Sequence, residues 1–161
     1  MNTISTPTIE AIISRNEIIE LIDANHDMSD LVLISISEPV LEGYNDEALT
    51  DSQVANFKDS LRVKFWDITD PIGHYDIISD ETALLLQQFI LSHISDRFII
   101  HCRAGQSRSA GVGKAIECIK YFGIGESAKY NYQTSFSSEI DTHPRYFPNL
   151  TVFNKLIKDY S

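Results

Sequence analysis

Several features that would assign a chain to a special class are missing from this sequence. No apolar run is long enough to cross a bilayer. The first residues, MNTISTPTIEAIISRNE, lack a basic stretch followed by an apolar one, so no secretory signal peptide is expected. Only two cysteines, Cys102 and Cys118, are present, which is too few for a disulfide framework and favours a reducing compartment. The sequence therefore predicts a cytoplasmic protein.

Positive charge is also scarce. The chain has 13 Lys and Arg against 23 Asp and Glu, a formal net charge of -10. A field of that sign repels nucleic acid and anionic membranes, so neither is expected as a partner. It repels phosphorylated ligands as well. A site for such a ligand must therefore gather its positive potential locally.

What is present is the composition of one globular domain spanning residues 1–161, with 43% hydrophobic and 22% charged residues and no internal repeat or long linker. Hydrophobic periodicity and capping signals predict strands at 9–13, 31–36, 61–65 and 98–100 and helices near 15–24, 80–94, 107–122, 126–132 and 148–160. The residues at 38–59 are expected to be mostly loop, with room for a short helix, and those at 133–138 a polar surface loop. This alternation predicts an α/β fold with a central, mostly parallel sheet flanked by helices.

The segment HCRAGQSRS at 101–109 falls between a predicted strand and the start of a predicted helix. Ligands of such folds bind beyond the carboxyl ends of the strands, and a helix N-terminus attracts anions. Gly105 allows a tight turn, and the backbone N–H groups of the loop can cradle phosphoryl oxygens. This predicts a phosphate site made by Arg103, Ala104, Gly105, Gln106, Ser107 and Arg108.

Two residues of this segment suggest covalent chemistry. Cys102 lies near the helix N-terminus and an arginine, an environment that favours the thiolate, which is the nucleophilic form. Arg108 follows six positions later and can fork onto two phosphoryl oxygens. Together they predict phosphoryl transfer through a phosphocysteine.

The segment resembles the H-C-x5-R-[ST] signature of the protein tyrosine and dual-specificity phosphatases, and its inner residues are similar to those of small bacterial and viral members. The resemblance implies a phosphatase-type strand-loop-helix active site that hydrolyses phosphomonoesters. It also implies that Ser109 hydrogen-bonds the thiolate and helps it leave, and that His101 orients the cysteine without acting as a base. The substrate would be a phosphorylated protein or a small phosphomonoester.

The leaving oxygen needs a proton, which the family takes from an aspartate some thirty-odd residues before the cysteine. Asp67 lies 35 residues upstream of Cys102 and Asp70 lies 32, so the spacing admits either. Phe65-Trp66-Asp67-Ile68 looks similar to an F-x-D-I pattern of bacterial relatives, which favours Asp67. Unlike the W-P-D pattern of tyrosine phosphatases, no proline separates the tryptophan from the aspartate.

Weaker features qualify this interpretation. Arg103 adds a second positive charge to the loop. Relatives that prefer phosphoinositides carry basic residues at two variable loop positions, but here the second of these positions is Gln106, so the resemblance to them is weak. Pro148-Asn149 before Val152 is similar to a P-N-x-x-V motif of small bacterial relatives and could brace the loop. No metal or cofactor is expected, because the five histidines (His26, His74, His93, His101 and His143) show no ligand spacing with the cysteines.

Two alternatives stay open. A rhodanese-like or arsenate-reducing enzyme would also use a C-R-x-G loop, although such a loop typically has four residues between cysteine and arginine and this one has five. A catalytically silent phosphate-binding module would retain the loop without turnover. The sequence does not indicate the oligomeric state.

Overall fold

The computed structural model describes residues 2–73 and 75–161, so His74, one of the five histidines considered above, lies outside the described residues. Four strands form one sheet: β1 (Ile9–Ser14), β2 (Leu31–Ser37), β3 (Asp59–Lys64) and β4 (Arg97–Cys102). Their order is β1-β4-β2-β3, and every neighbouring pair is parallel. The predicted α/β class with a parallel sheet is confirmed.

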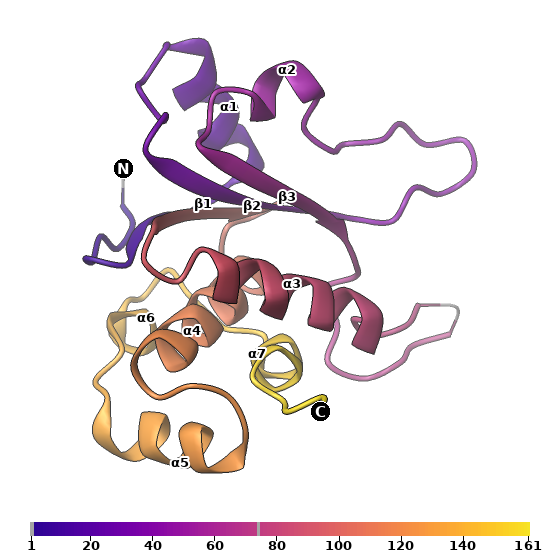
Figure 1. Ribbon diagram of the computed structural model, residues 1–161. Coiled ribbons are helices and arrows are strands. Elements are labelled where there is room, and N and C mark those ends of the chain that lie inside the picture. Colours follow the sequence, from indigo (N-terminus) through magenta and orange to yellow (C-terminus); the bar gives the residue numbers. More distant parts are fainter. Residues whose placement is uncertain (1, 74) are drawn as a thin grey trace.

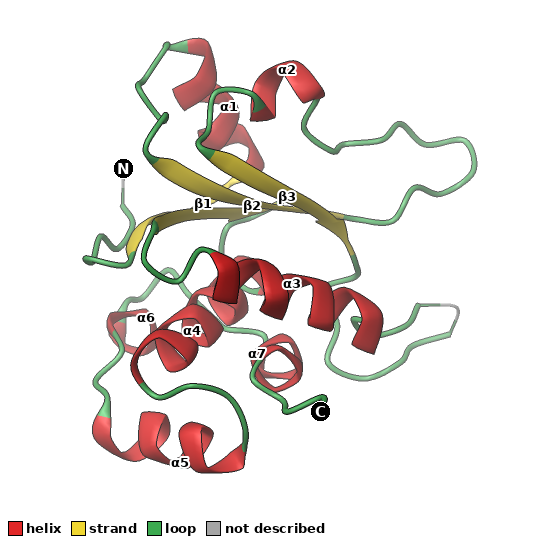
Figure 2. Cartoon of the chain, in the orientation of Figure 1, coloured by secondary structure: helices red, strands yellow, loops and turns green. Residues whose placement is uncertain are grey.

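Helices cover both faces of this sheet, as Figures 1 and 2 show. One face carries α1 (Arg15–Asp23) and the short α2 (Asp51–Val54). The other face carries α3 (Asp80–Ser92), α4 (Arg108–Tyr121), α5 (Glu126–Ser135), α6 (Glu139–Thr142) and α7 (Leu150–Leu156). No helix of the described residues combines the length and apolar character that crossing a bilayer requires.

Strand side chains alternate between two separate cores. In β4, Phe98 and Ile100 face the larger core under α3, α4 and α7, while Ile99 faces the smaller core under α1. The same alternation in β2 places Leu33 in the smaller core. Because strand side chains alternate with a period of two, strands covered on both faces become continuous apolar runs. These runs are what made β2 and β4 visible in the sequence.

Two predicted helix ends were wrong. The last helix was expected over 148–160, but α7 begins after Asn149, whose Oδ1 accepts the backbone N–H of Val152 at 3.1 Å. An asparagine cap needs a non-helical backbone, so Pro148 lies before the helix rather than in its first turn. The helix ends at Leu156, well short of residue 160.

The stretch at 133–138 is only partly the surface loop that its polarity predicted: its side chains are exposed up to residue 137, except at the half-buried Phe136, but its first residues are helical and its last is buried. Helix α5 continues to Ser135, and Ser138 is buried, donating to Glu117 Oε1 at 2.7 Å. Tyr132 donates to the same carboxylate oxygen at 2.7 Å. Burial raises the pKa of Glu117, although the two hydroxyl donors oppose the shift. Ser138 is therefore buried because it hydrogen-bonds a carboxylate inside the molecule.

Candidate functional site

Parallel strands end at one edge of the sheet, and the candidate site lies there. Cys102 is the last residue of β4, Glu38 follows β2, and the segment 65–70 follows β3. Helix α4 starts at Arg108, directly after the loop that leaves β4. This edge therefore joins the predicted nucleophile, the predicted phosphate clamp and both candidate acids.

The predicted nucleophile lies beneath the loop and is 2% exposed. Cys102 Sγ is 3.0 Å from Ser109 Oγ, in the first turn of α4. A hydroxyl at this distance can donate to a thiolate and stabilise it. The structure thus brings Cys102 and Ser109 together in the way that the proposed role of Ser109 requires.

His101 is buried between the sheet and the loop. Its Nδ1 lies 3.3 Å from the carbonyl oxygen of Cys102, and its Nε2 lies 2.6 Å from Ser35 Oγ. Burial, and then the charges of Arg15 and Arg108, lower the pKa of His101 to about 4, although its bond to the Cys102 carbonyl opposes the shift. A neutral ring with a proton on Nδ1 would donate to that carbonyl and accept from Ser35, which is the arrangement that the expected positioning role of His101 requires.

The 103–107 loop requires a glycine at its centre. Gly105 adopts φ +68°, in the left-handed region. A Cβ there would lie 2.5 Å from the backbone nitrogen of Ser14 and closer still to the carbonyl carbon of Ile13. The loop therefore packs directly on the end of β1, and only glycine fits both the turn and the contact.

Neighbouring segments hold the carbonyl groups of the 103–107 loop from outside. The backbone N–H of Arg15 donates to the carbonyl oxygen of Arg103 at 3.2 Å. The N–H of Phe147 donates to the carbonyl of Gln106 at 2.9 Å, and the N–H of Asn149 to the carbonyl of Ser107 at 3.1 Å. In a trans peptide the N–H points opposite to the C=O. The next N–H in each case therefore points away from these segments, toward the interior of the loop. Donors in this arrangement, together with the N-terminus of α4, are suited to cradle an anion.

A second arginine supports the loop from behind. Arg145 Nε donates to the carbonyl oxygen of Gly105 at 3.4 Å, and the Arg145 guanidinium forms an ion pair with Glu17. Burial would raise the pKa of Glu17, but its bonds with Arg145 and Ser14 lower it below the usual value. The sequence analysis missed Arg145, because no local pattern links it to a loop 40 residues away.

Arg108 is 3% exposed, and its guanidinium is held on two sides. One terminal nitrogen donates to the carbonyl oxygen of Phe65 at 2.8 Å and the other to Glu38 Oε1 at 3.2 Å. Its buried Nε has no hydrogen-bond partner among the described residues. Buried N–H groups are rarely left unpaired, so this one can donate to a water or to a ligand oxygen. Glu38 was also missed by the sequence analysis; an acid directly after a buried strand was the available signal.

Of the two candidate acids, Asp67 lies beside the loop. Its Oδ1 accepts from Ser107 Oγ at 2.8 Å and from Asn149 Nδ2 at 3.0 Å. Asn149 Nδ2 also donates to the carbonyl oxygen of Ile68 at 3.1 Å. Asp70 is exposed, three residues farther along the segment. The geometry favours Asp67, and it shows that the asparagine of the P-N-x-x-V stretch braces the loop and the acid segment together.

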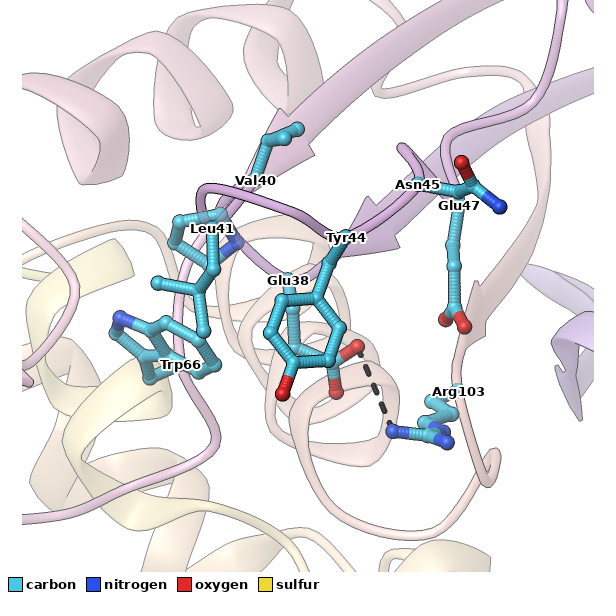
Figure 3. A pocket seen from close by; sticks show the side chains of 9 residues that line it. Glu38, Val40, Leu41, Tyr44, Asn45, Glu47, Trp66 and Arg103 are labelled. Atoms are coloured by element: carbon cyan, nitrogen blue, oxygen red, sulfur yellow. Dashed lines mark ion pairs between the residues drawn. The ribbon is translucent and has the colours of Figure 1, made fainter.

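The outer side of the 103–107 loop borders a cavity of about 500 Å³ (Figure 3). Arg103 projects to this side with 68% of its side chain exposed, and its guanidinium lies 3.9 Å from Glu38 Oε2. Trp66 forms part of the opposite wall in Figure 3. Among residues 2–73 and 75–161, no group of three or more His, Cys, Asp or Glu is arranged to hold a metal ion.

Three solved structures are similar to this chain over most of its length. One is a human tyrosine phosphatase-like serine/threonine/tyrosine-interacting protein (15% identity, TM-score 0.48), with 94% of this chain and 89% of that one covered. A second is Tk-PTP in the active form (19% identity, TM-score 0.49), with 92% of this chain and 86% of that one covered. The third is PTPMT1 (18% identity, TM-score 0.49), with 94% of this chain and 88% of that one covered. No protein-family model matches the sequence. No curated protein matches it either.

Proposed function

We propose that this chain is a phosphomonoester hydrolase of the protein tyrosine or dual-specificity phosphatase type, acting through a phosphocysteine. The observation that carries the proposal is the buried guanidinium of Arg108, with its Nε unpaired, at the helix end of a loop that starts at the Cys102 thiol. A phosphoryl group in that loop would give the Nε an acceptor. It would also occupy the inward N–H groups.

In the first step, the Cys102 thiolate attacks phosphorus opposite the leaving oxygen. The S–P bond forms, the P–O bond breaks, and the Asp67 carboxylic acid gives its proton to the departing oxygen. Charge on the equatorial oxygens is stabilised by the loop N–H groups and Arg108. The hydrogen bonds that the guanidinium donates to the Phe65 carbonyl and to Glu38 fix it in advance, so little reorganisation accompanies the reaction.

In the second step, water attacks the phosphocysteine. The Asp67 carboxylate takes a proton from the water, the new P–O bond forms, and the S–P bond breaks to regenerate the thiolate and release inorganic phosphate. Ser109 donates a hydrogen bond to the departing sulfur. The expected substrates are phosphorylated proteins or small phosphomonoesters, in the cytoplasm, without a cofactor.

A second candidate function is a phosphate-binding module without turnover. Two observations favour it: Cys102 is only 2% exposed, and Asp67 Oδ1 already accepts from both Ser107 and Asn149. Both functions share the anion cradle. They differ in whether the thiol reaches the phosphorus.

The test is hydrolysis of p-nitrophenyl phosphate in EDTA, between pH 5 and 8, by the wild type and by Cys102→Ser. We expect the wild type to turn over and the variant to lose at least ~10³-fold in kcat, since it lacks the nucleophile. Asp67→Asn should lower kcat by ~10²-fold or more, and the matched variant Asp70→Asn should not. If the folded wild type binds vanadate but releases no nitrophenol, the hydrolase proposal fails and the phosphate-binding module remains.

A further inference from the structure

The cavity beside the 103–107 loop is much larger than a phosphate requires. Its volume of about 500 Å³ lies within the range of roughly 300–1,000 Å³ that is typical of pockets for larger ligands. It is lined by Glu38, Pro39, Val40, Leu41, Tyr44, Asn45, Glu47, Trp66 and Arg103. Two of these residues connect it to the reacting centre: Arg103 follows Cys102, and Glu38 binds Arg108. A substrate held by the loop would therefore extend into this cavity.

The 38–47 loop, which supplies most of the cavity lining, is strongly acidic. It has four carboxylates in ten residues (Glu38, Glu42, Asp46 and Glu47) and no lysine or arginine. Asp46 is paired with Lys64 at 2.6 Å, and Glu38 is engaged by the two arginines of the site. Glu47 is anchored by its backbone, since Arg15 Nε donates to its carbonyl oxygen at 2.7 Å. Its carboxylate forms no ion pair among the described residues and extends into the cavity on the Arg103 side (Figure 3).

The aromatic wall of the cavity combines Trp66 with apolar and aromatic residues of the same 38–47 loop. The Trp66 indole meets Tyr75 edge-on, with ring centroids 4.6 Å apart and 73° between the planes. Tyr44 is 74% exposed, and Val40 and Leu41 of the same loop are also exposed. Figure 3 shows Tyr44 in front of Glu38, between Trp66 and Arg103 in that view. Aromatic faces next to carboxylates suit a long cationic side chain, because the rings pack on its stem and attract its charge.

We propose that this cavity is a specificity subsite for a basic residue, preferably arginine, that neighbours the phosphorylated residue of a peptide substrate. The inference rests on the proposed phosphatase function and names its substrate class. The phosphoryl group occupies the 103–107 loop. The basic side chain lies between the aromatic wall and Glu47. The net charge of -10 draws a basic peptide toward the protein at long range.

The same charges disfavour substrates that carry further phosphates. Arg103 is the one cation among the described residues that line the cavity, and Glu38 lies 3.9 Å from it. An extra phosphate at this position would meet the carboxylates of Glu38 and Glu47. Like charges in contact are costly, so inositol phosphates and acidic peptides are rejected.

The test uses matched phosphotyrosine and phosphoserine peptides that differ only in the two residues flanking the phosphorylated one: arginine, alanine or glutamate. We expect kcat/KM to be about three- to tenfold higher for arginine than for glutamate, with the preference shrinking as salt is added. Glu47→Gln should lower this ratio by at least about twofold. Glu42→Gln removes the same charge from the same loop outside the cavity and should leave the ratio unchanged.

The outcomes separate the inference from the function on which it rests. If the wild type fails on p-nitrophenyl phosphate, the hydrolase proposal fails, and binding of labelled peptides to Cys102→Ser then tests the subsite alone. Equal or better turnover of glutamate peptides or inositol phosphates overturns the subsite. It is overturned equally if Glu42→Gln and Glu47→Gln change the ratio alike. If hydrolysis of phosphorylethanolamine depends on Glu47 while the peptides are not discriminated, the peptide substrate is refuted. The cavity then binds the cationic group of a small phosphomonoester instead.

Discussion

Acidification should weaken this fold in a pH window that one buried imidazole defines. In the folded protein the pKa of His101 is lowered from 6.5 to about 4, first by burial and then by Arg15 and Arg108, against its bond to the Cys102 carbonyl. In the unfolded chain the same ring takes up a proton below about pH 6.5. The unfolded state therefore binds more protons, and the free energy of unfolding falls as the pH falls through this window.

The size of the effect follows from the two pKa values. A separation of about 2.5 pH units at ~1.4 kcal/mol per unit gives a stabilisation of about 3 kcal/mol. It is fully present above about pH 6.5 and lost by about pH 4. Because His101 is 1% exposed, solvent screening does not reduce it.

The assay is urea unfolding at constant ionic strength from pH 4 to 7.5, followed by the fluorescence of Trp66, the only tryptophan. The wild type is compared with His101→Asn, because the contributions of distant carboxylates to the pH dependence of unfolding are the same in both proteins and cancel in the difference. The wild type should lose about 3 kcal/mol relative to the variant as the pH falls. A difference between the two that stays constant across the window would refute the reasoning.

Three further predictions concern other parts of the structure. Gly105→Ala should lower the free energy of unfolding by more than ~2 kcal/mol and abolish vanadate binding. The control is Gly43→Ala, at a glycine with φ +82° but nothing within 4 Å of an added Cβ; it should lower the free energy of unfolding by only ~1 kcal/mol in the same urea assay and leave vanadate binding intact. Asn149→Asp keeps an oxygen for the helix cap but loses the donor to Asp67, so kcat for p-nitrophenyl phosphate should fall about tenfold, and an unchanged kcat would contradict the bracing role. Because the pKa of Glu117 is raised by burial, Glu117→Gln should gain stability relative to the wild type as the pH rises above about 4.5, and a loss would contradict this.

Local signals in the sequence were sufficient for much of the fold. The capping signal that contributed to the predicted helix near 15–24 is a box between Ser14 and Glu17. In the structure, Ser14 Oγ accepts the N–H of Glu17 at 3.1 Å, and Glu17 Oε1 accepts the N–H of Ser14 at 3.0 Å. Errors arose where distant partners decide the structure. Ser138 is buried because a carboxylate 21 residues earlier accepts its hydroxyl, and nothing nearby in the chain indicates this.

In the candidate site, too, residues close together in the sequence could be predicted, and residues whose partners are distant could not. Cys102, Arg108 and Ser109 lie within eight residues, so their arrangement follows from one strand-loop-helix connection. Asp67 and Asp70 could not be separated by spacing, because the answer depends on contacts made across the fold. Glu38 was invisible for the same reason: it binds an arginine 70 residues away, through the order of the strands in the sheet.

The bracing amide of Asn149 has a consequence for biosynthesis. It joins Ile68 and Asp67, 81 and 82 residues earlier, and its backbone holds the carbonyl of Ser107. Contacts of such long separation form late, since the intervening chain must be closed first. A ribosome that has just translated Cys102 must add 47 more residues before Asn149 exists (149 minus 102). The nascent chain therefore carries its thiol for that interval without a completed site, and we expect it to be inert toward phosphorylated substrates until the last helix has emerged.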